Sequence, residues 1–374
     1  MNQTDGITPR QLTAAAFVAV LSPLIRRFPR VTVATAGRTA WLSVPMTALP
    51  LALIGLVLWR FYRRRPLGTG FADILCLALG KWPGRILTGL YGLWVVFYAG
   101  FLLRSGADRF ITTVYPGAGP AVFVIVTVLL CLPALCARLC PITRAAMIFR
   151  PLMVILFLAV FILTTRDMDP ALLLPLTAGD LLPNAAAALQ TANALSSVAF
   201  LLFFTDHLNR RYTRRDGAVA WTVVMLGITL LMTLACLGVF GPALTARLSY
   251  PFFMLVRDFS ALGTLERAEP VVLALWVLSD FVMLSLLLQA AGKTLRFCFG
   301  QRAETPPVHA LDLRHGRWLL PACAAVAAGL ALALPAEAEA FQFLSDVLIP
   351  LAHAVAAFAL PLAVLCVGML RRRL

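Results

Sequence analysis

The chain has 374 residues, of which 61% are hydrophobic and 13% are charged, and its mean hydropathy is +0.88. Soluble domains contain about 25% charged and about 45–50% apolar residues, so this composition excludes an ordinary soluble enzyme or binding domain. Apolar runs of about 20 residues, the length that crosses a bilayer as a helix, recur along nearly the whole sequence. The sequence therefore predicts one transmembrane domain over residues 1–374.

The net charge of +15 comes from basic residues that cluster between the apolar runs and at the C-terminal end. No basic stretch is interleaved with aromatic residues that could stack on bases, which argues against nucleic-acid binding. Cytoplasmic segments of membrane proteins are rich in Lys and Arg, so these clusters predict that both termini are cytoplasmic. The clusters are Arg60, Arg63, Arg64 and Arg65; Arg210, Arg211, Arg214 and Arg215; and Arg371, Arg372 and Arg373.

The apolar runs predict an all-α polytopic membrane protein of about ten helices joined by mostly short, polar connections. The first five expected spans are Leu12–Phe28, Ala40–Trp59, Ile86–Leu103, Ala121–Cys136 and Ala145–Thr164. The second five are Asn184–Thr205, Ala218–Phe240, Val271–Leu295, Trp318–Leu334 and Leu348–Met369. Two sets of five in opposite orientation are what an inverted repeat produces, with repeat one at about 7–165 and repeat two at about 184–370.

Three segments between the spans have a character of their own. Phe71–Leu79 is apolar but too short to cross a bilayer, so we expect an interfacial helix there. Gly241–Pro270 mixes Pro, Gly, charged and aromatic residues and could hold a short helix over the outer side of the bundle. Gly300–Arg317 is polar and contains Pro, which predicts a cytoplasmic loop.

The first and sixth spans are the least uniformly apolar of the ten. In the first, Ser22 and Pro23 sit in the middle, and because Pro lacks an N–H and crowds the carbonyl four residues earlier, the helix should kink or open there. Polar residues occupy the middle of the sixth span, which membrane proteins tolerate where a helix faces protein or a water-filled cavity. Two roles remain open for these polar residues, hydrogen bonds to a ligand and hydrogen bonds between helices. They are Gln190, Asn193, Ser196 and Ser197.

Asp280 is the acidic residue expected at membrane depth, where an unpaired charge costs about 2.5–3.5 kcal/mol. We expect Arg26 or Arg27 of the first span to be its counter-charge; a site for a coupling proton or cation and a water-filled edge remain alternatives. The two Arg residues could also reinforce an anion site at the opened helix, for instance for a substrate carboxylate, or extend to the outer headgroups.

Other candidate residues have simpler interpretations. Gly89, Gly92 and Gly100 are expected to permit close packing of the third helix, and His353 is expected at a helix interface rather than in a proton relay. The cysteines lack the paired spacing of a zinc site, so neither a metal nor another cofactor is expected. The sequence contains no HExxH, no GxSxG and no paired acidic motif of intramembrane hydrolases, so an enzyme is not expected.

Five stretches lie in order along most of the chain. They are ITPRQL (7–12), AGRTAWLS (36–43), LGKWPGRILTGLYGLW (79–94), GVFGPALTARLSYP (238–251) and LGTLERAEPVVLALWVLSDF (262–281). These stretches resemble the spore-germination permeases, the B subunits of nutrient germinant receptors in the amino acid/polyamine/organocation transporter superfamily. Where such permeases have a Gly-rich break in the first helix, this chain has Ser22, Pro23 and Leu24, followed by Arg26 and Arg27.

The resemblance implies the 5+5 inverted-repeat fold of the leucine transporter, with a central ligand pocket between the first and sixth helices. It further implies a receptor subunit that binds a small nutrient, with an amino acid as the expected ligand, in the bacterial cytoplasmic membrane that forms the inner membrane of the spore. The implied partners are an A-type membrane subunit and a C-type lipoprotein. Two alternatives remain, a stand-alone proton-coupled amino-acid transporter and a diverged structural subunit without ligand. The expected pocket residues are Ser22, Pro23, Leu24, Gln190, Asn193, Ser196 and Ser197.

Overall fold

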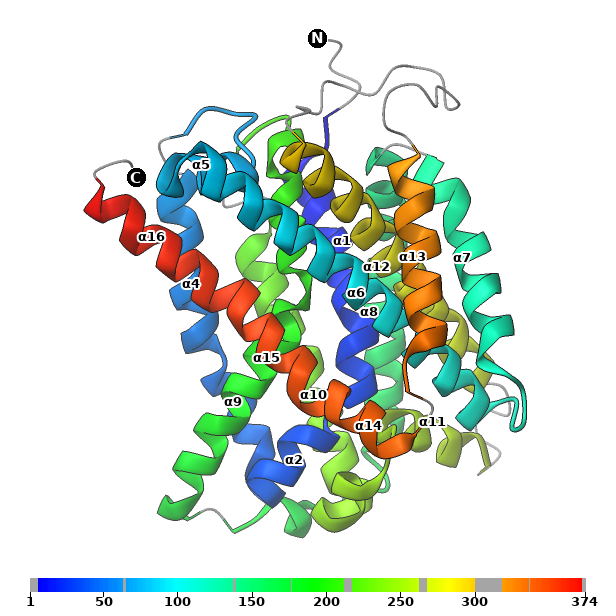
Figure 1. Cartoon of the computed structure of the whole chain (residues 1–374). Coiled ribbons are helices and arrows are strands. Elements are labelled where there is room, and N and C mark those ends of the chain that lie inside the picture. The colour runs from blue at the N-terminus through cyan, green and yellow to red at the C-terminus, as the bar shows by residue number, and fades with distance from the viewer. Residues whose placement is uncertain are drawn as a thin grey trace.

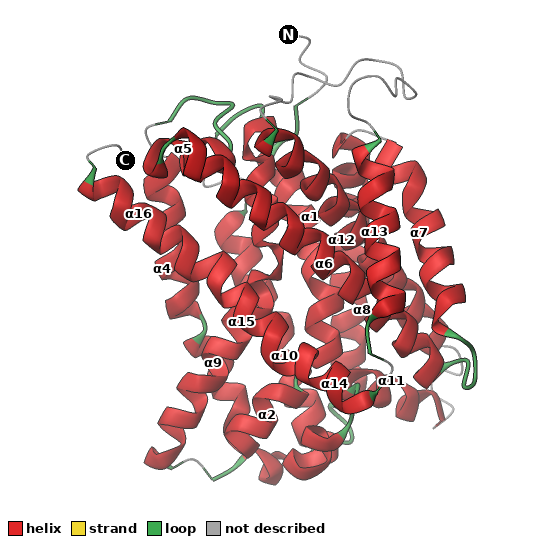
Figure 2. Cartoon of the chain, viewed as in Figure 1, coloured by secondary structure: helices red, strands yellow, loops and turns green. Residues whose placement is uncertain are grey.

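The chain folds into a bundle of helices, and the part that the structure describes contains one isolated backbone bridge and no strand (Figures 1 and 2). The computed structural model describes residues 6–62, 65–136, 139–175, 177–211, 217–261, 268–299, 318–335 and 337–371. The expected loop Gly300–Arg317 lies outside these residues.

The helices of the first half of the chain include one long element, α6, and several short ones. Their bounds are α1 (Pro9–Arg27), α2 (Arg30–Ala36), the 3-10 helix η1 (Gly37–Leu42), α3 (Ser43–Met46), α4 (Ala48–Tyr62), α5 (Phe71–Leu79), α6 (Lys81–Thr113), α7 (Pro120–Cys136) and α8 (Leu139–Thr164).

The second half contains α-helices together with short 3-10 and π-helical segments. The 3-10 helices are η2 (Pro170–Leu173), η3 (Ala178–Asp180) and η4 (Ser196–His207), and the π-helical segments are η7 (Leu344–Leu348) and η8 (Val355–Ala359). The α-helices are α9 (Leu181–Leu195), α10 (Ala218–Arg247), α11 (Pro251–Ala261), α12 (Ala268–Cys298), α13 (Leu319–Ala333), α14 (Ala338–Phe343), α15 (Ile349–Ala354) and α16 (Leu360–Leu370).

Seven helical stretches of the described residues are long and apolar enough to cross a membrane, so the chain is an integral, multi-pass membrane protein. Two shorter apolar helices, Pro120–Leu135 and Leu319–Ala333, and the 19-residue α1 coincide with the other three expected spans. The count of ten therefore stays a prediction. The seven stretches are Arg30–Tyr62, Lys81–Thr113, Leu139–Thr164, Ala178–His207, Val219–Arg247, Pro270–Cys298 and Glu339–Leu370.

Two expected short helices are present. α5 covers Phe71–Leu79, buries one face and packs against α6 and α16, as an interfacial helix would. α11 lies in the connection after α10 and packs against α12, α10 and α8. α10 continues past its expected end at Phe240. The helix bends at Gly241, whose φ of 70° is a conformation that glycine adopts readily, and it resumes at Pro242.

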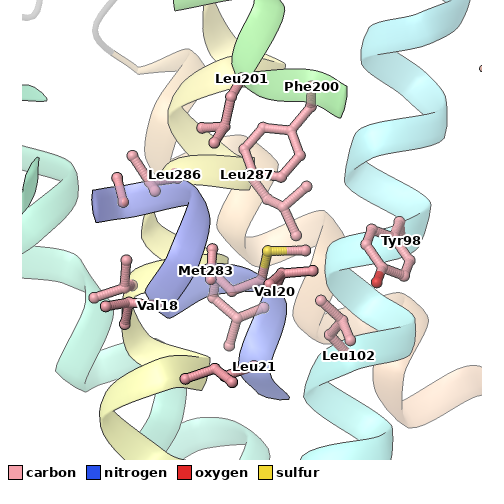
Figure 3. Close-up of a cluster of buried hydrophobic side chains, with 14 of the residues drawn as sticks. Val18, Val20, Leu21, Tyr98, Leu102, Phe200, Leu201, Met283, Leu286 and Leu287 are labelled. Carbon is pink, nitrogen blue, oxygen red and sulfur yellow. The ribbon is translucent and has the colours of Figure 1, made fainter. Parts of the chain in front are cut away.

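α1 runs through the centre of the bundle, where almost all of its side chains are buried (Figure 1). It packs against α8, α12, η4 and α9. Figure 3 shows apolar side chains of four elements meeting around it, and these side chains form the middle of one continuous core. They are Val18, Val20 and Leu21 of α1, Tyr98 and Leu102 of α6, Phe200 and Leu201 of η4, and Met283, Leu286 and Leu287 of α12.

The glycines of α6 permit close helix packing, as expected. A Cβ on Gly89 would lie 2.7 Å from Cys298 Sγ, one on Gly92 would lie 2.5 Å from Thr294 Oγ1, and one on Gly100 would lie 2.8 Å from the Ala327 carbonyl oxygen. The first two contacts join α6 to α12 and the third joins it to α13. The absence of side chains at these three glycines therefore allows α6 to pack closely against α12 and α13.

We expect Gly100→Ala to lower the thermal unfolding temperature of the purified protein in detergent, because the Ala327 main-chain oxygen cannot move without displacing α13. Overpacking of this kind costs about 1–3 kcal/mol. Gly55→Ala is the matched control, since no heavy atom lies within 4 Å of its added Cβ and Ala favours a helix. Equal unfolding temperatures for the two variants would contradict this account of the α6–α13 contact.

Candidate functional site

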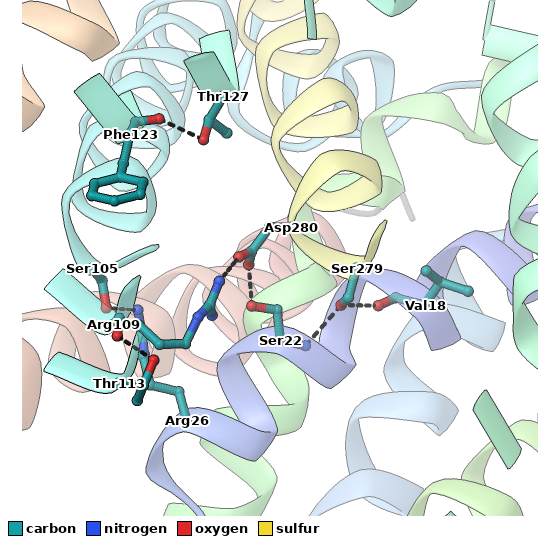
Figure 4. Close-up of polar contacts among 10 residues, drawn as sticks. All are labelled: Val18, Ser22, Arg26, Ser105, Arg109, Thr113, Phe123, Thr127, Ser279 and Asp280. Carbon is teal, nitrogen blue, oxygen red and sulfur yellow. Dashed lines mark hydrogen bonds and ion pairs between the residues drawn. The ribbon is translucent and has the colours of Figure 1, made fainter. Parts of the chain in front are cut away.

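The hydrogen-bond ladder of α1 is opened at Ser22 by a side chain from α12. The Ser22 N–H donates to Ser279 Oγ at 2.9 Å, and the Ser279 hydroxyl donates to the Val18 carbonyl at 2.5 Å, so a hydroxyl stands between two groups that normally bond to each other (Figure 4). The next residue, Pro23, has no N–H to donate to Ala19. The expected opening is thus present, but as an insertion, because α1 continues as one helix to Arg27.

The counterpart of this opening lies where α9 changes into the 3-10 helix η4 at Ser196. Two side chains here bond to other elements: Asn193 Nδ2 donates to the Pro350 carbonyl at 2.7 Å, and Gln190 exchanges hydrogen bonds of 3.0 and 3.1 Å with the Thr35 hydroxyl. Ser196 Oγ donates to the Asn193 carbonyl at 2.7 Å. These three residues thus serve as links within and between helices.

A cavity of about 90 Å³ lies between α1, α9, η4, α6 and the segment from η7 to α15. A buried water needs at least about 10–15 Å³, so this cavity can hold a cluster of waters or a small polar molecule. Five residues selected from the sequence line it, and they come from two helices about 170 residues apart in the chain. They are Pro23, Arg26, Gln190, Asn193 and Ser197.

Three expected pocket residues lie elsewhere. Ser22 turns to α12, where its hydroxyl donates to Asp280, and Leu24 is fully buried in the apolar core. Ser196 lines a separate void of about 10 Å³, too small for more than one water. Arg27 belongs to α1, but the position of its side chain lies outside what the structure describes.

The segment from η7 to α15 contributes two cavity residues that were not expected there, Asp346 and His353. The His353 ring meets Tyr98 edge-on with centroids 4.4 Å apart and Trp94 with centroids 5.8 Å apart. These contacts fit the expected helix interface, since they pack α15 against α6. The signals in the sequence were His353, within the otherwise apolar last expected span, and Asp346, two residues before that span begins.

The counter-charge of Asp280 is Arg109 of α6, which differs from the expected Arg26 or Arg27. Asp280 accepts hydrogen bonds from the Arg109 guanidinium and the Ser22 hydroxyl (Figure 4). Arg26 instead donates to the Ser105 hydroxyl, one turn before Arg109 on α6. The pair was missed because the third span was expected to end at Leu103, whereas α6 continues to Thr113 and keeps Arg109 inside the bundle.

Arg109 is enclosed by aromatic rings as well as by the carboxylate. Only 1% of its side chain is exposed, and its guanidinium carbon lies 3.9 Å from the centre of the Trp276 ring. A guanidinium over a ring is stabilised by the ring's negative face, most of all where water is excluded. The ion pair, the ring and Ser22 therefore join α6, α12 and α1 at one point.

A further charged pair lies near the C-terminal end of α12. Lys293 donates to Asp206 of η4, and the Lys293 nitrogen lies 5.6 Å from the centre of the Phe204 ring. Beside this pair the main chain before α1 is tied to the end of η4: the Ile7 N–H donates to the His207 carbonyl at 2.9 Å and the Asn209 N–H donates to the Ile7 carbonyl at 3.0 Å. Side-chain and main-chain contacts thus close the bundle at this end.

Within the part of the chain that the structure describes, no group of three His, Cys, Asp or Glu side chains could hold a metal ion. The charged groups that stand at the centre are arranged for hydrogen bonds and ion pairs.

Comparison with known proteins gives one match of high coverage. A family model with the description "Spore germination protein" matches residues 6–311 of the 374. The matched region includes α1, α6, α9, η4 and α12, and so all of the central contacts except those of the last span. No curated protein matches the chain.

We expect Asp280→Ala to lower the free energy of unfolding by about 3–5 kcal/mol, because the change leaves the Arg109 charge buried without its partner. The double variant Asp280→Ala/Arg109→Ala should lose less than the sum of the two single changes, measured by denaturant unfolding in detergent. The cycle with Arg26→Ala is the control and should show the smaller coupling. Additive effects with Arg109 would mean that the ion pair does not form in the folded protein.

Proposed function

The chain belongs to the spore germination protein family, and on this premise we propose that it is the permease subunit of a nutrient germinant receptor. In this proposal the central cavity binds a small nutrient, an amino acid, and the occupied subunit signals through an A-type membrane subunit and a C-type lipoprotein. Binding takes place without catalysis.

The observation that supports this proposal is the cavity at the meeting point of α1 and the α9–η4 helix, with several polar groups on its lining. Its lining combines a basic side chain, Arg26, with an acidic one, Asp346, and with two side-chain amides and the Ser197 hydroxyl. Ligand sites have this character, a few polar groups placed among apolar walls. Opposite charges on one lining suit a zwitterion, which is the form of a free amino acid at neutral pH.

The proposed fold is the ten-helix inverted repeat. It is supported by the way in which the first and sixth helices meet antiparallel and both lose regular α-helical bonding halfway, at Ser22 and at Ser196. Substrate sites of such folds lie where discontinuous helices of the two repeats meet near the middle of the membrane.

The proposed location is the inner membrane of the spore with both termini in the cytoplasm. The start of α1 and the end of α16 lie at the same end of the bundle (Figure 1). Basic residues gather there: Arg211 donates to the Arg65 carbonyl and Arg371 donates to the Leu79 carbonyl. This concentration of positive charge supports the cytoplasmic assignment of that end.

A stand-alone proton-coupled amino-acid transporter is the second candidate, and Asp346 and His353 favour it because both are titratable and line the cavity. Asp280 gives it no support, since its charge is balanced by Arg109 and it does not line the cavity. Uptake of a labelled amino acid into liposomes under a pH gradient separates the two candidates, because a receptor subunit alone would show binding without accumulation.

We expect Ser197→Leu and Asn193→Leu each to abolish nutrient binding, because a leucine side chain would fill much of the cavity. Binding is measured on the purified full-length protein as the shift in thermal unfolding temperature caused by each of the 20 amino acids, and function as the germination response of spores that contain the variant. Thr165→Leu, at an exposed position that does not line the cavity, is the matched control. An unchanged shift and response in both cavity variants would place the nutrient site elsewhere.

A further inference from the structure

We infer that Arg26 is the anchor for a carboxylate group in the central cavity, so that the ligand is oriented with its acid end on α1. This inference rests on the proposed nutrient site and specifies which chemical group that site recognises. Four observations lead to it.

The first observation is the charge of the buried cluster around α1. Arg26 is 8% exposed and Arg109 is 1% exposed, and both lie within electrostatic range of Asp280. Two guanidinium groups and one carboxylate leave a formal charge of +1 in a region from which water is largely excluded. Buried charges in proteins are paired, so the cluster lacks one anion.

The second observation shows which of the two guanidinium groups has a charge that is not balanced. Arg109 is ion-paired with Asp280, whereas Arg26 donates to Ser105, a neutral hydroxyl. The buried Nε–H groups of Arg26 and of Arg109 both have no partner among the described residues, so Arg26 has a free donor as well as an unbalanced charge. A carboxylate matches a guanidinium that still offers donors, because the two groups can form charge-assisted hydrogen bonds side by side.

The third observation is that Arg26 lines the cavity while Arg109 does not. The missing anion can therefore reach Arg26 from the cavity and needs no rearrangement of the ion pair behind it. The Phe101 ring, 5.0 Å from the Arg26 guanidinium carbon, holds this side chain in place before a ligand arrives.

The fourth observation is a second unpartnered donor on the same lining. Ser197 Oγ is buried and has no hydrogen-bond partner among the described residues. A ligand with a carboxylate on Arg26 would present further oxygen atoms to such a hydroxyl. Asp346, the acidic residue of the lining, is exposed.

The test compares free amino acids with their amides, which keep the ammonium group but have no carboxylate. Glycine, L-alanine, L-valine, L-leucine, L-asparagine and L-proline, each as the acid and as the amide, are titrated against the purified full-length chain, and Kd values are taken from the thermal shift. We expect each acid that binds to bind about 10- to 100-fold more tightly than its amide, the effect of one hydrogen bond between charged groups.

Arg26→Gln should remove this preference by weakening the acids about 10- to 100-fold and leaving the amides within threefold of wild type. Arg26→Lys keeps the charge and should keep part of the preference, which guards against a variant that is merely misfolded. Arg104→Gln is the matched control: Arg104 is also a buried arginine, but it is bonded to Asp108 and to the Leu334 carbonyl and does not line the cavity.

Four results would overturn the inference. Amides that bind as tightly as acids, or a preference for acids that survives Arg26→Gln, would remove the role of Arg26 while leaving a nutrient site in the cavity. Sodium chloride that raises the unfolding temperature as much as the acids do would make the cavity a site for simple anions. Absence of binding by every acid and amide would contradict the inference and the proposed function together.

Discussion

The Asp280 carboxylate determines how the centre of this bundle is built, because a charge that is mostly shielded from water must find its main partners within the protein. It draws the Ser22 hydroxyl from α1 and the Arg109 guanidinium from α6, and the neighbouring Ser279 inserts into the backbone of α1. These polar contacts fix the three helices in one register, whereas an apolar interface would leave the register less strictly defined. The wall of the cavity formed by α1 depends on this register, because Arg26 is one turn beyond Ser22.

Much of the fold was predictable because bilayer and helix rules act locally. Hydropathy located the spans, and Pro23 with the polar residues around Asn193 marked the two helices whose regular bonding is interrupted. The glycines of α6 were equally informative, because a missing side chain has one main use on a membrane helix, which is close packing. Each of these inferences needs only residues within a few turns of one another.

The partners of the charged residues could not be derived in the same way. Arg109 lies beyond Leu103, where the third span was expected to end, yet Trp276 and Asp280 of α12 allow α6 to keep it buried. Asp346 and His353 line the cavity only because the last span lies across α1 and α9, which is a property of the tertiary fold. Span boundaries at charged residues are therefore where sequence reasoning failed, and the central site depends on them.

The main-chain tie between Ile7 and the residues after η4 has an evolutionary consequence. It is made of amide and carbonyl groups, so a substitution at the exposed Asn209 preserves it unless proline, which has no N–H, removes a bond. The side chain is restricted at two other positions. Ile7 is 1% exposed and belongs to the core, and a Cβ on Gly6 would lie 2.8 Å from Asn209 Cβ. Homologous chains can thus diverge at position 209 while retaining the junction itself, provided that position 6 stays small and position 7 stays apolar.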